Sequence, residues 1–125
     1  MANDYFSFKR FTVRQPRSAM KVGTDGVVLG AWFDVGGPGA RILDVGTGTG
    51  LLALMAAQRN PTSRIDAVEI DPSSCLDAAE NFAASPWGDR LRLFAESSAS
   101  FRSRSTGGYD RIVSNPPSFV RSPPS

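Results

Sequence analysis

The sequence Ser-Asn-Pro-Pro-Ser-Phe occupies residues 114–119, directly after an apolar run. The side-chain carbonyl of Asn115 and the backbone carbonyl of Pro116 are hydrogen-bond acceptors, and Pro116 and Pro117 restrict the backbone that carries them. Two acceptors aimed at the N–H groups of a conjugated amine would localise its lone pair, and fixed dipoles do so at little reorganisation cost. Phe119 could stack on a planar substrate. This motif indicates methyl transfer to a planar amine; the simpler alternative is that the two prolines only end a strand.

A second motif, Leu-Asp-Val-Gly-Thr-Gly-Thr-Gly-Leu, spans residues 43–51. Gly46, Gly48 and Gly50 permit positive φ angles and let a ligand approach the backbone closely. The helix that follows would add free amides and a partial positive charge. Leu51 stands where the dinucleotide fingerprint has its third glycine, and no Lys-Ser/Thr pair follows as a P-loop requires. The loop therefore predicts another nucleotide-like ligand or a carboxylate, with a simple glycine turn as the alternative.

The elements that must position these motifs follow from the spacing of apolar residues and helix formers. The expected strands are residues 41–45, 64–70, 90–94 and 109–114. The expected helices are residues 24–33, residues 51–59 and a third that begins at Asp71-Pro72, a favourable N-cap and first turn. Alternating apolar and polar residues at 5–13 indicate a short hairpin.

Two of these elements carry a pattern that predicts which side is buried. The third helix has an expected apolar face of Leu76, Ala79, Phe82 and Ala83. The strand at 90–94 alternates Leu91 and Leu93 with Arg90 and Arg92, which suits an edge strand with one solvated face.

Strands that alternate with helices predict an α/β fold with right-handed crossovers and a parallel sheet. The expected strand order is 3-2-1-4, and ligands of such sheets bind at the carboxyl ends, beside the switch point between strands one and four. The glycine loop and the Asn-Pro-Pro motif both follow strands that end there. Glu69 ends strand two, where a carboxylate can accept two hydrogen bonds from ribose hydroxyls.

Composition excludes several classes of chemistry. A chain of 125 residues, 41% hydrophobic, suits a single domain. Cys75 is the only cysteine and histidine is absent, which rules out an internal disulfide, Ser–His or Cys–His catalysis and most zinc sites. We therefore expect no metal, and a reducing, cytoplasmic compartment. No apolar run is long enough to span a bilayer, so no membrane association is expected.

Charge is distributed unevenly along the chain. Residues 1–21 hold five bases and one acid, and residues 101–125 hold four arginines and one acid, whereas acids outnumber bases in between. Basic ends can meet phosphates, although a merely solvated terminus is the simpler explanation of charge alone.

Five stretches together resemble the amino-methyltransferases that carry an Asn-Pro-Pro-Tyr motif, and more narrowly the bacterial tRNA1(Val) adenine-N6 methyltransferase family. They are residues 19–32, 42–59, 65–71, 79–91 and 109–119, of which Lys-Val-Gly-Thr-Asp-Gly followed by Leu-Gly-Ala-Trp is the most specific. The resemblance implies a Rossmann-like methyltransferase fold dependent on S-adenosylmethionine, with tRNA as substrate.

The resemblance also implies roles for particular residues. Asn115, Pro116 and Pro117 would hold the target amine with Phe119 nearby, and Arg10, Arg14, Arg17 and Lys21 could hold tRNA phosphates. The cofactor contacts that it implies are Lys21, Thr24, Asp25, Asp44, Gly46, Thr47, Gly48, Gly50, Glu69, Ile70, Glu96, Ser97 and Asn115.

Three positions depart from the family pattern. Ser118 stands where the family usually has tyrosine, so Phe119 would supply a stacking ring one position later. An aspartate usually contacts the adenine amine after strand three, but the matching position here is Ser97, with Glu96 before it. Arg111 lies in a strand that is usually apolar at that position.

Members of the family continue for further strands and helices, so the resemblance implies a sheet truncated before its last strands. We expect residues 1–35 to form a basic arm and a helix that cap the cofactor site, and residues 36–125 to form the first half of the Rossmann-like domain. The remaining half, or a partner chain, would cover strand four. The alternatives are methylation of a protein glutamine or a DNA adenine, or an inactive cofactor-binding fragment that serves as an assembly module.

Overall fold

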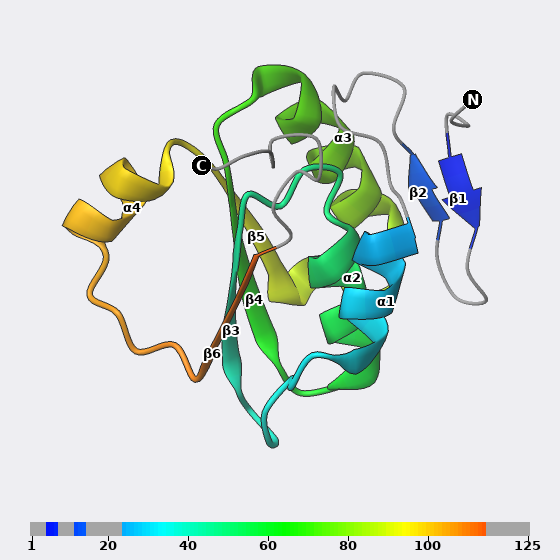
Figure 1. Cartoon of the computed structure of the whole chain (residues 1–125), viewed down its shortest axis with the longest axis horizontal. Coiled ribbons are helices and arrows are strands. Elements are labelled where there is room, and N and C mark those ends of the chain that lie inside the picture. The colour runs from blue at the N-terminus through cyan, green and yellow to red at the C-terminus, as the bar shows by residue number, and fades with distance from the viewer. Residues whose placement is uncertain (1–4, 8–11, 15–23, 115–125) are drawn as a thin grey trace.

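The structure is a computed structural model that describes residues 5–7, 12–14 and 24–114, and Figure 1 shows their arrangement. The helices are α1 (Thr24–Trp32), α2 (Leu51–Arg59), α3 (Pro72–Ala84) and α4 (Ser98–Arg104), with a 3-10 turn at Gly88–Arg90. The strands are β1 (Tyr5–Ser7), β2 (Thr12–Arg14), β3 (Arg41–Val45), β4 (Arg64–Glu69), β5 (Leu91–Ala95) and β6 (Arg111–Ser114). β1 and β2 form the expected antiparallel hairpin.

The main sheet has four parallel strands in the order β5-β4-β3-β6. This arrangement confirms the predicted order 3-2-1-4. In the register of the central strands, Val45 at the end of β3 lies opposite Val68 of β4 and Ser114 of β6. The carboxyl ends of β3, β4 and β6 are therefore neighbours at one edge of the sheet.

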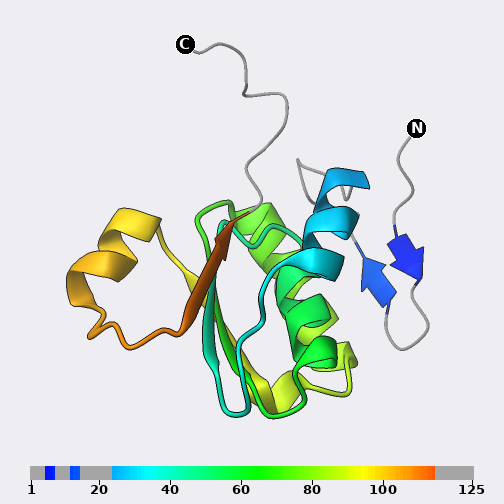
Figure 2. The ribbon, with the colours of Figure 1, turned by 60° about the horizontal axis from the view of Figure 1, so that its bottom comes forward.

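Helices lie on both sides of this sheet, as the two ribbon views show (Figures 1 and 2). Because side chains alternate along a strand, Ile42 and Ile65 face α2 and α3, whereas Leu43 and Val68 face α4. The first side holds the larger buried cluster, and Phe101 of α4 closes the smaller one. Helix α1 packs closely on α2, since a Cβ at Gly30 would lie 2.2 Å from the sulfur of Met55.

The predicted apolar face of α3 is wrong in all but one residue. Phe82 is buried, but Leu76 is 57% exposed and Ala79 and Ala83 are also exposed. The helix is rotated so that a mixed face points inward, formed by Ser74, Cys75, Asp77, Ala78, Asn81 and Phe82. This rotation is stable because part of that face contacts backbone rather than apolar side chains, and Asn81 finds hydrogen-bond partners there.

Residues 90–104 also differ from the prediction. Arg90 belongs to the 3-10 turn, and its guanidinium donates to the carbonyl of Ala57 in the last turn of α2 (3.0 Å) and to that of Ser63 beyond the end of this helix (2.7 Å). The Arg92 side chain is exposed, as expected, although Phe94 on the same side of β5 packs against Phe101 of α4. Helix α4 was not expected, because its serines are poor helix formers; Ser97 stabilises it as the N-cap by accepting from the Ser100 N–H at 3.0 Å.

Candidate cofactor site

The glycine loop connects β3 to α2 at the carboxyl edge of the sheet, as predicted. Gly46, Gly48 and Gly50 all adopt left-handed backbone angles, with φ of 72°, 58° and 92°. The Val68 carbonyl of β4 accepts from the amides of Gly46 (2.8 Å) and Thr47 (3.0 Å), which holds the first half of the loop against the sheet. These φ values explain why glycine is needed at each position, because other residues are strained there.

The two sides of this loop differ. A Cβ at Gly50 would lie 2.5 Å from the Phe82 ring of α3, so the inner side is closely packed. A Cβ at Gly46 or Gly48 would meet no atom within 4 Å in the described part of the chain. The loop therefore presents an open backbone surface on one side, where a ligand can approach.

Glu69 at the end of β4 lies directly against this loop. Its Oε1 accepts from the Gly48 N–H at 2.7 Å and its Oε2 accepts from the Asp71 N–H at 3.0 Å. A carboxylate has about four acceptor positions, so capacity remains for hydroxyl donors. Backbone donors on both oxygens fix the orientation in which the carboxylate would meet a ribose.

Asp44, the second carboxylate of this edge, is 1% exposed. Its Oδ2 accepts from the Thr47 hydroxyl at 2.7 Å, whereas its Oδ1 has no hydrogen-bond partner among the described residues. Burial raises the pKa of Asp44 to about 7, against the lowering effects of the Thr47 bond and of the Ala53 backbone N–H, and the nearby charge of Glu69 raises it further. A buried oxygen without a donor is a place where a ligand donor would be favourable.

The Asn-Pro-Pro motif begins directly after the described part of β6. Asn115, Pro116, Pro117 and Phe119 lie outside the described residues, and so does Lys21. Ser114, the last residue of β6, is the register partner of Val45, and Gly46 follows Val45. The chain therefore enters its Asn-Pro-Pro motif from the strand end that adjoins the glycine loop. Thr24 and Asp25 are the first two residues of α1, and only their backbone is described.

The remaining predicted cofactor residues lie further along the same edge. Ile70, which follows β4, is 68% exposed and offers an apolar surface beside Glu69. Glu96 follows β5 and forms an ion pair with Arg104, whose hydrogen bond holds the pKa of Glu96 below its usual value. The Ser97 hydroxyl caps α4. The side chains of Glu96 and Ser97 therefore bond to residues of α4, whereas the Glu69 carboxylate bonds to the glycine loop.

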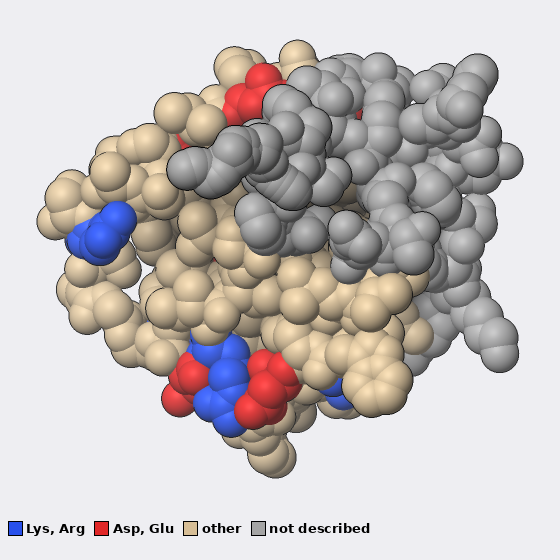
Figure 3. Space-filling model, viewed as in Figure 1, with Lys and Arg blue, Asp and Glu red and all other residues tan. Residues whose placement is uncertain are grey.

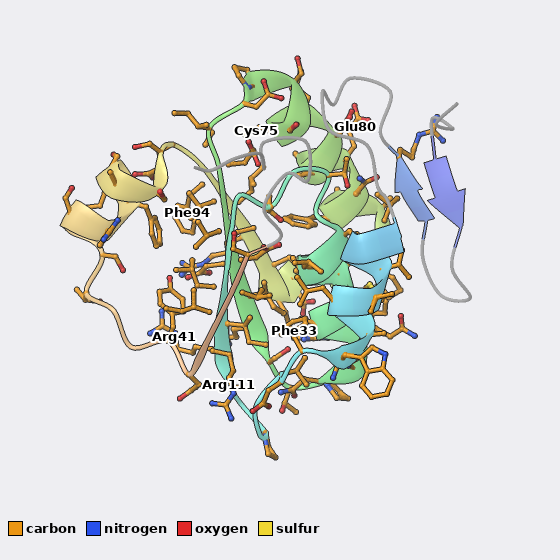
Figure 4. The ribbon with its side chains drawn as sticks, viewed as in Figure 1. Phe33, Arg41, Cys75, Glu80, Phe94 and Arg111 are labelled. Carbon is orange, nitrogen blue, oxygen red and sulfur yellow. The ribbon has the colours of Figure 1, made fainter. Side chains whose placement is uncertain are left out.

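Arg111, which departs from the family pattern, has a structural partner. Its Nη2 lies 2.9 Å from Oδ2 of Asp34, in the segment that precedes β3. Arg111 lies near the lower end of the sheet, where Figure 3 shows acidic and basic side chains side by side (Figures 3 and 4). This charge is therefore accommodated at the end of the sheet opposite the glycine loop.

Sequence reasoning missed Asn81, which contacts the glycine loop from α3. Its side-chain Nδ2 donates to the Thr49 carbonyl at 2.8 Å. The only signal in the sequence is an asparagine in the middle of a helix, where this residue type is unfavourable without a specific partner.

A parallel sheet with a glycine loop and an acidic strand end at its switch point defines a Rossmann-like nucleotide-cofactor domain. The chain belongs to the family described as the methyltransferase small domain, whose model matches residues 26–122. Its fold is that of S-adenosylmethionine-dependent methyltransferases: a SAM-dependent methyltransferase from Agrobacterium tumefaciens superposes with a TM-score of 0.71 at 19% identity, over 93% of this chain and 41% of that one.

Curated relatives carry more specific names. A protein of Parabacteroides distasonis named tRNA1(Val) (adenine(37)-N6)-methyltransferase is 53% identical over 98% of this chain and 51% of its own length. The solved structure of TrmN from Thermus thermophilus is 34% identical, with a TM-score of 0.56 over 64% of this chain and 24% of that one. The chain spans about half the length of the curated relatives that it matches.

The described residues lack two kinds of feature. None of the helices there has the length and apolar character required to cross a membrane. No three His, Cys, Asp or Glu side chains there are grouped so that they could hold a metal ion.

Proposed function

We propose that this chain is the cofactor-binding part of an S-adenosylmethionine-dependent methyltransferase that modifies the N6 amine of an adenine in tRNA. The observation that carries the proposal is the pairing of β6 with β3. Because Ser114 pairs with Val45, the Asn-Pro-Pro motif and the glycine loop follow neighbouring strand ends. The family match and the names of the curated relatives support the same chemistry. We propose the cytoplasm as its location, because tRNA modification requires access to tRNA.

The residues present fit this cofactor. Glu69 would accept from the ribose hydroxyls, and the open backbone at Gly46 and Gly48 leaves room for the methionine part. The unpartnered Oδ1 of Asp44 offers an acceptor beside them, with Thr47 holding the other oxygen. Ile70 would pack on the adenine. When bound, the cofactor supplies a methyl group on a positively charged sulfur.

Asn115 and Pro116 are proposed to hold the target amine. Their carbonyl oxygens would accept from its two N–H groups and draw the nitrogen toward a tetrahedral geometry, with Pro117 restraining the backbone and Phe119 stacking on the base. No strong base is required, because the nitrogen becomes acidic once it is alkylated. The lack of histidine in the sequence is consistent with this mechanism.

The basic ends of the chain are proposed to contact the tRNA backbone. Arg10, Arg14, Arg17 and Lys21 would neutralise phosphates, so tRNA binding should weaken as salt rises. Residues 1–35 are proposed as the arm that covers the cofactor, and residues 36–125 as the first half of the domain. The part of the relatives that lies beyond this chain is proposed to cover β6.

The cofactor and the acceptor are tested in separate measurements. Calorimetry with S-adenosylmethionine and with NAD tests the site, and we expect heat of binding only with the first. A panel of valine tRNA, adenine-containing DNA and a glutamine-bearing protein then tests the acceptor, with N6-methyladenosine in tRNA detected by mass spectrometry. Cofactor binding without transfer to any acceptor would favour the cofactor-binding fragment.

The clearest variant is Asn115→Ala. Removing the side-chain acceptor should lower the rate of methyl transfer at least 100-fold, as for loss of one preorganised hydrogen-bond group in an active site. Affinity for S-adenosylmethionine should change less than about threefold, because the target amine and not the cofactor is the proposed partner of this carbonyl. Single-turnover assays and calorimetry measure the two quantities.

Ser114→Ala is the matched control, because it changes the exposed neighbouring residue at the end of β6. We expect wild-type transfer from this variant. A normally active Asn115→Ala variant would refute the proposed role of Asn115.

A further inference from the structure

Asn81 joins two parts of the molecule that are far apart in the sequence. Its Nδ2 donates to the Thr49 carbonyl of the glycine loop and to the Arg14 carbonyl of β2, both at 2.8 Å. Its Oδ1 accepts from the Arg14 N–H, also at 2.8 Å. The side-chain amide therefore pairs with β2 as a neighbouring strand would, and at the same time holds the loop.

The contact is buried and complete. Asn81 is 2% exposed, so water cannot replace the bonds that its amide makes. Both hydrogens of the Nδ2 group are used, one on each carbonyl, and a displacement of either carbonyl stretches one of these bonds. The loop and β2 are thereby coupled through a single planar group.

The neighbouring residue of α3 holds the same loop. A Cβ at Gly50 would lie 2.5 Å from Cε1 of the Phe82 ring. The ring is thus packed against Gly50, and the loop cannot move toward α3. Asn81 and Phe82 together fix the inner side of the loop at Thr49 and Gly50. The open side at Gly46 and Gly48 is left for the ligand.

The hairpin is tied to the core at the same point. Val13, which precedes Arg14, is fully buried in the cluster that contains Phe82 and Leu51. Arg14 itself is exposed, and the basic segment of residues 15–23 leads from it to α1. Asn81 therefore bonds to the backbone of the residue that directly precedes that segment in the sequence.

We propose that Asn81 is a positioning residue that couples the glycine loop to the N-terminal hairpin, so that cofactor binding in the loop stabilises the hairpin at Arg14. The proposal rests on the proposed function for the identity of the ligand. By reciprocity, whatever fixes the hairpin also strengthens cofactor binding. Asn81 contacts neither the cofactor nor the substrate in this scheme.

Asn60 provides a matched control. It is 5% exposed, and its Nδ2 also donates to backbone carbonyls, at short range to those of Val35 (2.8 Å) and Gly37 (2.9 Å) and at 3.5 Å to that of Gly36. It lies at the end of α2, at the opposite end of that helix from the loop. Asn81→Asp and Asn60→Asp each preserve size and replace a donor with a negatively charged acceptor that faces two carbonyls.

Both variants should lower the melting temperature, because both bury an unfavourable charge. Only Asn81→Asp should weaken S-adenosylmethionine binding, by about tenfold in calorimetry, and Asn60→Asp should stay within about twofold. In hydrogen exchange, S-adenosylmethionine should slow exchange of the Arg14 amide in the wild type but not in the Asn81 variant. If Asn81→Asp does not fold, Asn81→Ser and Asn60→Ser replace the pair, since a serine side chain is too short to reach both carbonyls.

Equal losses of affinity in the two variants, or slowed exchange of the Arg14 amide in the Asn81 variant, would overturn the coupling. Failure of the wild-type chain to bind S-adenosylmethionine would instead contradict the proposed function. In that event the exchange rates of Thr49, Gly50 and Arg14 still decide the inference, because loss of the Asn81 amide should accelerate all three about tenfold relative to Asn60→Asp.

Discussion

Two buried aspartates, Asp44 and Asp66, lie on neighbouring strands and face opposite sides of the sheet. Asp44 is 1% exposed and Asp66 is 5% exposed. Asp44 lies beneath the glycine loop and is held by one hydroxyl, with its Oδ1 left without a described partner. Asp66 lies on the α4 side, and both of its oxygens accept hydrogen bonds.

The partners of Asp66 come from three other segments. Arg92 of β5 donates to both of its oxygens, at 3.0 and 3.2 Å, and the Tyr109 hydroxyl donates to Oδ2 at 2.6 Å. Arg41 of β3 lies 3.9 Å away and stacks on the Tyr109 ring at 4.7 Å. Burial and the bond to Asp66 raise the pKa of Tyr109 to about 12. Figure 4 shows Arg41 and Phe94 on this side of the sheet.

Asp66 links neighbouring strands through its bonds, whereas Asp44 retains an acceptor for a ligand. Both burials cost desolvation energy, but two arginines offset this cost at Asp66, whereas among the described residues no positive charge does so at Asp44. We therefore propose this uncompensated carboxylate, which lies at a glycine loop, as a ligand-binding group.

The largest expected effect concerns pH and Asp44. Its pKa is about 7 when folded and near 3.8 when unfolded, so the folded state binds the extra proton between these values. Stability should therefore fall as pH rises from about 4 to 7, by up to about 4 kcal/mol from this group. Asp44→Asn should lose this component, as measured by urea unfolding of both proteins at pH 5 and pH 8.

If the wild type and Asp44→Asn lost stability in parallel between these two pH values, Asp44 would not be the source of the pH dependence. Calorimetry supplies the second readout, because the variant should also bind S-adenosylmethionine roughly tenfold more weakly through loss of a charged acceptor.

Asp66→Asn should lower the stability of the fold, whereas Asp44→Asn removes a charge that lowers it at high pH. Asp66→Asn removes the charge that faces Arg92 and Arg41, and a loss of about 2 kcal/mol is expected because Arg92 remains partly solvated. S-adenosylmethionine affinity should remain unchanged, since these contacts lie on the α4 side. Unfolding at pH 8 and calorimetry test both statements, and a stabilised Asp66→Asn variant would contradict the bracing role.

The smallest effect is expected at Glu96. Its carboxylate pairs with Arg104 at the surface, where ion pairs contribute little to stability. Glu96→Gln should leave the melting temperature nearly unchanged and S-adenosylmethionine affinity within about twofold. A large loss of affinity with an unchanged melting temperature would instead support the adenine contact that the family resemblance implies.

Much of the fold could be predicted because local patterns and topology rules agree. The strand order was predicted correctly, since short connections and right-handed crossovers leave few arrangements of four such strands. The loop position was also predictable, because its glycines adopt the positive φ angles that set them apart in the sequence. The inward face of α3 could not be predicted, because Leu76 and Cys75 are both apolar and periodicity alone does not show which of them is buried.

Most of the elements, their order in the sheet and the expected ligand-binding edge could be inferred from the sequence, since these follow from short-range preferences and chain connectivity; helix α4 could not. The contacts between polar groups became known only from the folded arrangement: Asn81 with Thr49 and Arg14, Arg90 with the end of α2, and Asp66 with two arginines. Hydrogen bonds require that donor and acceptor be placed to within a few tenths of an ångström, and no local pattern encodes this placement for residues far apart in the chain.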